Sequence, residues 1–192
     1  MDLADRRGIE RDVYQPAEDS ALLADVATSV ITPDDVVLDV GTGSGFVAER
    51  IAEETGARVI GSDLNPHACR RARERRVPVV RGNLTDPFVD GAFDVVTFNP
   101  PYLPTDPETE WDDWMEVALS GGETGLAVVE PFLASVRRVL APDGVVLLLA
   151  SSLAGVEAVV ELAAAEGFSA VALRDDSYPF ETLTVLKLIQ TE

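Results

Sequence analysis

The sequence contains very little of several residues on which common kinds of protein chemistry depend. Among 192 residues it has one cysteine, Cys69, one histidine, His67, and one lysine, Lys187. A single cysteine excludes an internal disulfide framework and fits a reducing compartment. One histidine and one cysteine make no His/Cys metal site, so we expect no metal centre. No apolar run has the length of a membrane span, and the charged N-terminus lacks a signal-peptide core, so we expect a cytoplasmic protein.

Residues of positive charge are scarce as well. Fifteen basic residues face 34 acidic ones, which gives a net charge of −19 at pH 7. Such a charge keeps a protein soluble and repels nucleic acid unless salt screens it, so nucleic acid is an unfavoured partner. The composition resembles that of proteins from salt-loving organisms. Five arginines gather in one short segment, which we interpret as a solvated face balancing nearby acids; they are Arg70, Arg71, Arg73, Arg75 and Arg76.

Short apolar runs alternate with segments of helical periodicity along most of the chain. Strands are predicted at residues 36–40, 58–63, 77–81, 93–98, 145–150, 169–174 and 183–189, and helices at 18–30, 46–55, 66–76, 125–140 and 154–166. The link between the last two strands is too short for a crossover helix, so they pair antiparallel. The prediction is one α/β domain over residues 1–192, with a mostly parallel seven-stranded sheet and helices on both faces.

Two further segments are predicted to lack regular structure. Residues 1–12 are expected to form a flexible polar arm. A long loop at residues 103–122 carries Trp111 and Trp114. These tryptophans either pin the loop or belong to a substrate lid, because loops of this length are often functional.

Three glycines, Gly41, Gly43 and Gly45, follow the acidic residue Asp39 at the end of the first strand. Glycine allows the backbone to approach a ligand closely, and the helix that begins here offers its N-terminus. A dinucleotide-binding loop has its last glycine one position after Gly45, where this chain has Phe46. The spacing therefore favours a ligand that is not held through a pyrophosphate, with a tight strand-to-helix turn as the alternative.

Polar residues also follow the second and third strands. Asp63 ends the second strand 20 residues after Gly43, the position at which an acid hydrogen-bonds ribose hydroxyls in nucleoside-binding α/β folds. An exposed acid at a strand end is the alternative. Asn83 and Leu84 offer a polar contact and an apolar platform to an adenine, although Asn83 also suits a turn.

The fourth strand is followed at once by Asn99-Pro100-Pro101-Tyr102. Proline donates no hydrogen bond and keeps the residue before it extended, so the strand stops here. Ligands of open α/β sheets bind at this end of the strands. The Asn99 carboxamide and the Pro100 carbonyl suit the two hydrogens of a planar N–H₂ group, and the Tyr102 ring suits its face. A plain strand end with a capping asparagine is the alternative.

Taken together, these residues resemble the signature of class I S-adenosylmethionine-dependent methyltransferases, in the branch that methylates planar amide or amino nitrogens. The segment at 13–20, Val-Tyr-Gln-Pro-Ala-Glu-Asp-Ser, looks like the N-terminal motif of the HemK-like protein-glutamine methyltransferases. Gly121-Gly122 and residues 181–187 are similar to that family as well. Only 13 residues precede Tyr14, and this short form resembles the archaeal and eukaryotic branch. The bacterial branch carries a separate helical N-terminal domain.

The resemblance implies an enzyme that N-methylates the glutamine of the Gly-Gly-Gln motif in class I translation release factors. S-adenosyl-L-methionine is then the methyl donor and S-adenosyl-L-homocysteine the product. A heterodimer with a small zinc-containing activator protein is also implied. Because relatives of this branch have been linked to lysine side chains and to DNA adenine, methylation of lysine or of an exocyclic base amine stays an alternative. A catalytically silent binding subunit is the non-enzymatic alternative.

The same resemblance assigns roles to individual residues. Asp39 and the glycines would hold the methionine part of the cofactor, Asp63 and Leu64 the ribose, and Asn83 and Leu84 the adenine. The whole cofactor-binding set is Ser20, Asp39, Gly41, Gly43, Gly45, Asp63, Leu64, Asn83 and Leu84. Tyr14, Pro16 and Pro101 are assigned to substrate binding, and Asn99, Pro100 and Tyr102 to catalysis.

One interface is predicted from the expected strand order. Residues 77–81 would lie at an edge of the sheet, and an apolar edge strand invites pairing with another chain unless it is covered. We therefore expect the activator to dock at Val77, Val79 and Val80.

Overall fold

The computed structural model describes residue 13, residues 15–105 and residues 114–191. The helices are α1 (Glu18–Val30), α2 (Phe46–Thr55), α3 (Pro66–Glu74), α4 (Trp114–Leu119), α5 (Val129–Val139) and α6 (Val156–Ala165). The strands are β1 (Val36–Val40), β2 (Arg58–Asp63), β3 (Val79–Arg81), β4 (Phe93–Phe98), β5 (Leu140–Ser151), β6 (Phe168–Ser177) and β7 (Thr182–Gln190). No helix of the described part has the length and apolar character to cross a membrane.

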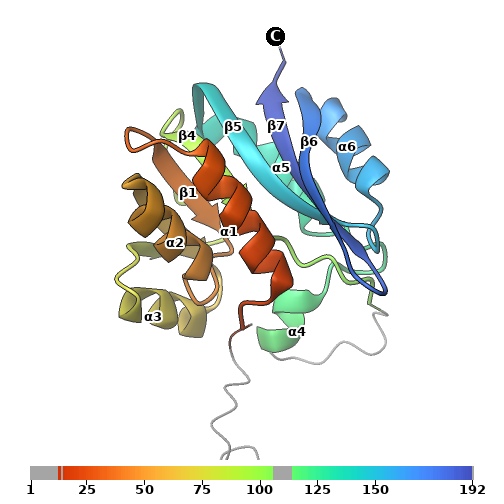
Figure 1. Ribbon diagram of the computed structural model, residues 1–192, viewed down its shortest axis with the longest axis horizontal. Coiled ribbons are helices and arrows are strands. Elements are labelled where there is room, and N and C mark those ends of the chain that lie inside the picture. The colour runs from red at the N-terminus through yellow and green to blue at the C-terminus, as the bar shows by residue number, and fades with distance from the viewer. Residues whose placement is uncertain (1–12, 14, 106–113, 192) are drawn as a thin grey trace, which may run out of the picture.

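The strands form one sheet in the order β3-β2-β1-β4-β5-β7-β6 (Figure 1). β1 to β5 pair in parallel, and β7 runs antiparallel to both β5 and β6. The predicted fold class, a mostly parallel seven-stranded sheet with a C-terminal antiparallel hairpin, is confirmed. The parallel strands place the ends of β1, β2 and β4 side by side, where ligands of such sheets bind.

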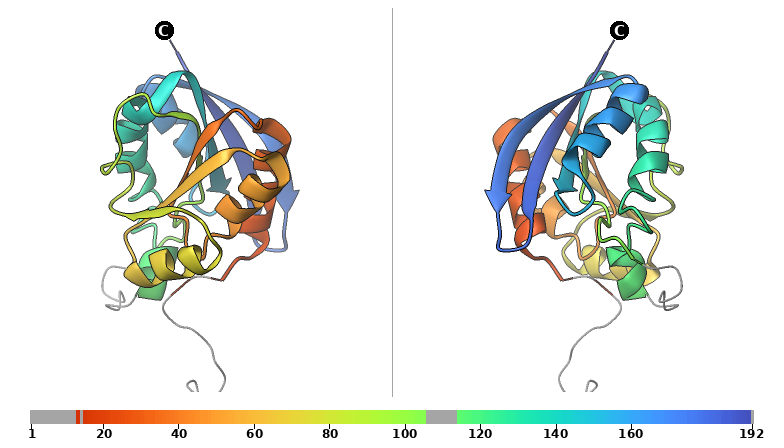
Figure 2. Two further views of the ribbon diagram at one scale, coloured as in Figure 1. Left: turned by 90° about the vertical axis from the view of Figure 1, so that its left-hand side faces the viewer. Right: turned by 90° about the vertical axis from the view of Figure 1, so that its right-hand side faces the viewer.

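Helices cover both faces of the sheet (Figure 2). Because side chains alternate along a strand, each strand feeds two hydrophobic cores. Val37 and Leu147 belong to the cluster under α1 and α2, whereas Leu38 and Leu148 belong to the cluster under α5 and α6. These clusters hold the strand ends, and therefore the polar residues that follow them, in fixed positions.

Several element boundaries differ from the prediction. α3 ends at Glu74, because Arg76 has a left-handed backbone with φ of 64°. α5 begins at Val129, which leaves Pro131 in the first helical turn, where its missing N–H costs nothing. β3 is shorter than predicted and begins only after Pro78. The helix α4 inside the long loop was not predicted.

Asp19 and Ser20, near the start of α1, do not cap this helix. The N-cap position is Ala17, which makes no side-chain capping hydrogen bond. Both residues instead lie in the first turn and are buried, with Asp19 4% and Ser20 7% exposed. A buried acid at this place needs partners from elsewhere in the fold.

Candidate active site

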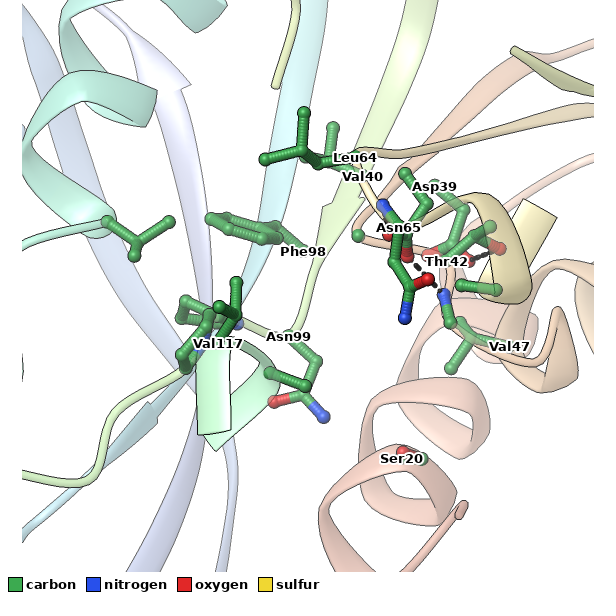
Figure 3. A pocket seen from close by; sticks show the side chains of 18 of the residues that line it. Ser20, Asp39, Val40, Thr42, Val47, Leu64, Asn65, Phe98, Asn99 and Val117 are labelled. Carbon is green, nitrogen blue, oxygen red and sulfur yellow. Dashed lines mark hydrogen bonds between the residues drawn. The ribbon is translucent and has the colours of Figure 1, made fainter. Parts of the chain in front are cut away.

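A cavity of about 420 Å³ lies at the ends of β1, β2 and β4, within the size range of small-molecule sites. The first turn of α1 and the helix α4 complete its wall (Figure 3). It brings together 13 of the residues singled out from the sequence: Pro16, Ser20, Asp39, Gly41, Gly43, Asp63, Leu64, Asn83, Leu84, Asn99, Pro100, Pro101 and Tyr102. Tyr14 lies outside the described residues.

Gly45 is the one described residue of the predicted cofactor set that does not line the cavity. It is the N-cap of α2, with φ of 82°. A Cβ atom at this position would lie 3.0 Å from the Cα of Ala72 in α3. The absence of a side chain at Gly45 therefore allows α3 to pack against the start of α2. A contact of Gly45 with the cofactor stays a prediction.

Asp39 is buried, and two threonine hydroxyls donate to its carboxylate. Thr42 Oγ1 lies 2.6 Å from Oδ2, and Thr97 Oγ1 lies 2.7 Å from Oδ1. Burial raises the pKa of the Asp39 carboxyl from 3.8 to about 6, and the two hydroxyl hydrogen bonds oppose this shift. Among the described residues no basic side chain forms an ion pair with it. Asp39 is thus a buried anion that suits a cationic group of a ligand.

Asp63 closes the glycine loop at the end of β2. Its Oδ2 accepts from the Gly43 N–H at 2.9 Å, and its Oδ1 accepts from the Asn65 N–H at 2.8 Å. Burial raises the pKa of the Asp63 carboxyl, and these backbone hydrogen bonds lower it. Each carboxylate oxygen has a second lone pair, so the group can also accept from a ligand hydroxyl.

Asn99 leaves β4 with its carboxamide in a defined orientation. Its Nδ2 donates to Asp19 Oδ2 at 3.0 Å. Its Oδ1 is buried and has no hydrogen-bond partner among the described residues. The preceding residue, Phe98, packs against Phe132, with ring centroids 4.4 Å apart and the ring planes tilted by 47°. Because buried polar atoms are nearly always paired, this acceptor is available to a donor from a bound water or ligand.

Some cavity residues were not predicted to take part in the site. Asp19 belongs to the segment 13–20, but no role was predicted for it, because its contact with Asn99 spans 80 residues of sequence. Val117 is 53% exposed and reaches the cavity from α4, a helix that was not predicted. Glu181, at the start of the last strand, also lines the cavity and accepts from Ser151 Oγ at 2.7 Å. Residues 181–187 had been noted only as similar to the HemK-like family.

The sheet order with its reversed β7, the glycine loop after β1 and the Asn-Pro-Pro-Tyr segment after β4 define the class of α/β methyltransferases. A family model described as a methyltransferase domain matches residues 37–122. The chain is 33% identical to a Methanocaldococcus jannaschii protein named as a protein N5-glutamine methyltransferase, over 91% of this chain and 90% of that protein. It is 30% identical to human methyltransferase HEMK2, over 96% and 93% of the two chains.

Solved structures agree with these relatives. The Encephalitozoon cuniculi protein in the Mtq2-Trm112 complex, described as responsible for methylation of the eRF1 translation termination factor, superposes with a TM-score of 0.77. It is 27% identical, and the match covers 94% of this chain and 99% of that one. The chain therefore belongs to the HemK-like family of protein-glutamine methyltransferases.

Proposed function

We propose that the protein transfers a methyl group from S-adenosylmethionine to the side-chain nitrogen of the glutamine in the Gly-Gly-Gln motif of a class I translation release factor. The observation that carries this proposal is the buried, unpaired Oδ1 of Asn99 at the end of β4. A planar N–H₂ group of a substrate would be able to donate to this acceptor. The names of the similar proteins support the same substrate. Two of them align with this chain over at least 90% of both chains.

The cavity fits the proposed cofactor by the chemistry of its residues. S-adenosylmethionine carries a cationic ammonium and sulfonium, a ribose and an adenine. Asp39 supplies a buried negative charge, and Asp63 supplies an acid beside the glycine loop. Leu64 lines the cavity beside Asp63, where the ribose would lie, and Leu84 supplies apolar surface for the adenine. When bound, the cofactor supplies an electrophilic methyl group.

The residues around Asn99 would address the central difficulty of the reaction. The lone pair of an amide nitrogen is spread into its carbonyl, which makes the nitrogen a poor nucleophile. Asn99 Oδ1 and the Pro100 carbonyl would accept the two amide hydrogens and aim the nitrogen, while Tyr102 would pack on the amide face. Orientation of this kind can supply about 7–11 kcal/mol of a barrier. Bound S-adenosylmethionine would supply the methyl group and leave as S-adenosylhomocysteine, and the proton released from the amide nitrogen would pass to water.

No residue is assigned as a dedicated base. His67, in the first turn of α3, does not line the cavity. The acceptors at Asn99 and Pro100 strengthen as positive charge grows on the nitrogen, which favours the transition state over the ground state.

A labelling experiment tests the proposed function. The protein is incubated in high salt with radiolabelled S-adenosylmethionine and a class I release factor, with and without the activator. We expect label on the factor, and we expect it to vanish when the Gly-Gly-Gln glutamine is replaced by alanine. Duplex DNA serves as the second substrate. Label on DNA alone, or label that survives loss of the glutamine, would show that the proposed substrate is wrong.

We also propose a heterodimer with a small zinc-containing activator, docked at β3. β3 pairs with β2 on one side, and within the described residues no strand pairs with its other side. Val80 is 38% exposed there, whereas Val77 is buried in the core. Val77 would thus contribute only through its backbone. The similar protein of known structure was solved in a complex with Trm112, which supports a partner of this kind.

Replacing Val80 with lysine is expected to weaken the activator complex. Val80 is the better choice than Val79, because the side chain of Val79 is partly buried against the core. A charge placed at the centre of a strand-pairing interface should raise the dissociation constant at least about tenfold. Val171→Lys, on the opposite edge strand β6 and 48% exposed, is the control. Unchanged affinity for Val80→Lys in a calorimetric titration would exclude β3 as the interface.

A further inference from the structure

The side chain of Asn99 has a buried neighbour, Asp19, to which the resemblance of the segment 13–20 assigns no role. Asp19, in the first turn of α1, is 4% exposed and accepts from Asn99 Nδ2 at 3.0 Å. Figure 3 shows the carboxamide of Asn99 extending from β4 toward the helix that carries Ser20. The contact joins the beginning of the first helix to the end of the fourth strand, across the mouth of the cavity.

The chemistry of this contact selects one of two orientations of the carboxamide. An amide has a donor end and an acceptor end of nearly equal shape, whereas an ionised carboxylate only accepts. Asp19 therefore holds the N–H₂ end of Asn99. The Oδ1 end is left facing the site, where it has no partner among the described residues.

We propose that Asp19 is a positioning residue that sets the hydrogen-bond polarity of the site. By fixing the carboxamide, it makes Asn99 an acceptor for the nitrogen that is methylated. With the opposite orientation, Asn99 would present two N–H donors to the N–H₂ group of the substrate. The inference rests on the proposed function for its substrate, and it adds a reason why the site takes an amide nitrogen.

Two contacts of Asp19 with Ser20 indicate the effect of a substitution. Ser20 donates to Asp19 Oδ1 through its backbone N–H at 2.6 Å and through its Oγ at 3.2 Å. In an Asp19→Asn variant these donors keep the oxygen of the new amide on their own side. The new N–H₂ group then takes the place of Oδ2 and faces Asn99. Asn99 must rotate to accept from it, which turns its own N–H₂ group into the site.

The exchange of the two residues restores the polarity. In the double variant Asp19→Asn with Asn99→Asp, the carboxylate at 99 accepts from the amide at 19 with one oxygen. Its other oxygen faces the site as an acceptor. The single variant Asn99→Asp instead sets two carboxylates against each other, which costs free energy unless they share a proton. Each single change should therefore be harmful, and the pair should compensate.

The test is a double-mutant cycle in kcat for methylation of the release factor. Asp19→Asn is expected to lower kcat about a hundredfold, as loss of one oriented hydrogen bond in an active site does. The dissociation constant for S-adenosylmethionine, measured separately by calorimetry, should stay within about twofold, because the polarity change faces the substrate. The double variant Asp19→Asn with Asn99→Asp should have a kcat at least about tenfold higher than either single variant. A double variant no better than the worse single one, or a wild-type kcat in Asp19→Asn, would overturn the proposal.

A second measurement separates this proposal from the proposed function. The Nδ2 protons of Asn99 are assigned in the nitrogen-15 NMR spectrum by their loss in Asn99→Ala. In the wild-type protein they should be protected from solvent exchange by Asp19, and this protection should change in Asp19→Asn. A further outcome is that the release factor is not methylated while the protection of the Asn99 Nδ2 protons still changes in Asp19→Asn. In that case the proposed substrate is wrong and the positioning role of Asp19 stands. Equal protection in both proteins would exclude the positioning role.

Discussion

Replacing Asn99 with alanine is expected to lower kcat for methyl transfer by about a hundredfold or more, the usual effect of removing one preorganised hydrogen-bonding group from an active site. The carboxamide contributes the buried, unpaired Oδ1, and it spans the gap between β4 and Asp19. Alanine removes this acceptor and leaves Asp19 without the N–H₂ group. The measurement is single-turnover methylation of the release factor, with the affinity for S-adenosylmethionine determined in parallel.

A matched substitution in the same cavity distinguishes catalysis from binding. Asn83 lines the end of the cavity away from β4 and is exposed, with its Nδ2 directed at Asp86 Oδ2 at 3.4 Å. Asn83→Ala should raise the dissociation constant of S-adenosylmethionine and leave kcat nearly unchanged. Asn99→Ala should lower kcat and leave the dissociation constant of S-adenosylmethionine nearly unchanged. An Asn99→Ala enzyme with the wild-type kcat would show that the acceptor plays no part in the reaction.

The second large effect is expected at Asp39, which we assign to the cationic part of the cofactor. Asp39→Asn removes the charge and keeps the shape, so Thr42 and Thr97 retain a polar neighbour. We expect the affinity for S-adenosylmethionine to fall by at least about tenfold, since a hydrogen bond to a charged group contributes about 1.5–3 kcal/mol. Asp94→Asn is the control, because Asp94 lies outside the cavity and accepts from the Val36 N–H at 2.8 Å.

The pH dependence of cofactor binding follows from the same carboxylate. The pKa of Asp39 is about 6 in the folded protein, so the group ionises as the pH rises through that value. The affinity for the cationic cofactor should therefore increase from pH 5 to pH 7 in the wild-type protein and change much less in Asp39→Asn. Equal pH profiles for the two proteins would contradict the assignment of Asp39 to the cofactor.

As the pH rises, the contribution of Asp39 to the free energy of unfolding should fall, whereas the affinity for S-adenosylmethionine should increase. The folded-state pKa of Asp39, about 6, lies above its ordinary value of 3.8, so the native state binds the proton more tightly than the unfolded state. The contribution of this group to stability is then largest at low pH and falls as the pH rises from about 4 through about 6. The full penalty is about 3 kcal/mol for a shift of this size. Asp39→Asn should raise the free energy of unfolding at pH 7.5, measured by denaturant titration.

Most of the site was predictable because it lies at the ends of strands. Asp39, Asp63 and Asn99 each follow or end an apolar run, and parallel pairing brings the ends of such runs together. The geometry required only the strand order, which alternating strands and helices already indicate. The placement of the third strand at the sheet edge followed from the same order and is confirmed for Val79–Arg81.

What escaped prediction depends on contacts between distant segments or on the absence of a side chain. Asp19 meets Asn99 across 80 residues, and nothing local to the first helix indicates that contact. Gly45 belongs to the glycine loop by its spacing, yet the absence of a Cβ atom there allows Ala72 of α3 to pack closely against it. The helix α4 has only six residues, too few for periodicity to be recognised within a long loop.

The central claim is that the nitrogen methylated is that of the Gly-Gly-Gln glutamine, and peptide mass spectrometry tests it most directly. The release factor is digested after reaction with the protein and unlabelled S-adenosylmethionine, and fragment ions locate the added methyl group. The account predicts a single methyl group on the side chain of that glutamine, absent when the Asn99→Ala protein is used. A methyl group on a lysine of the release factor would contradict this expectation. Methylation of DNA adenine without any methylation of the factor would contradict it as well.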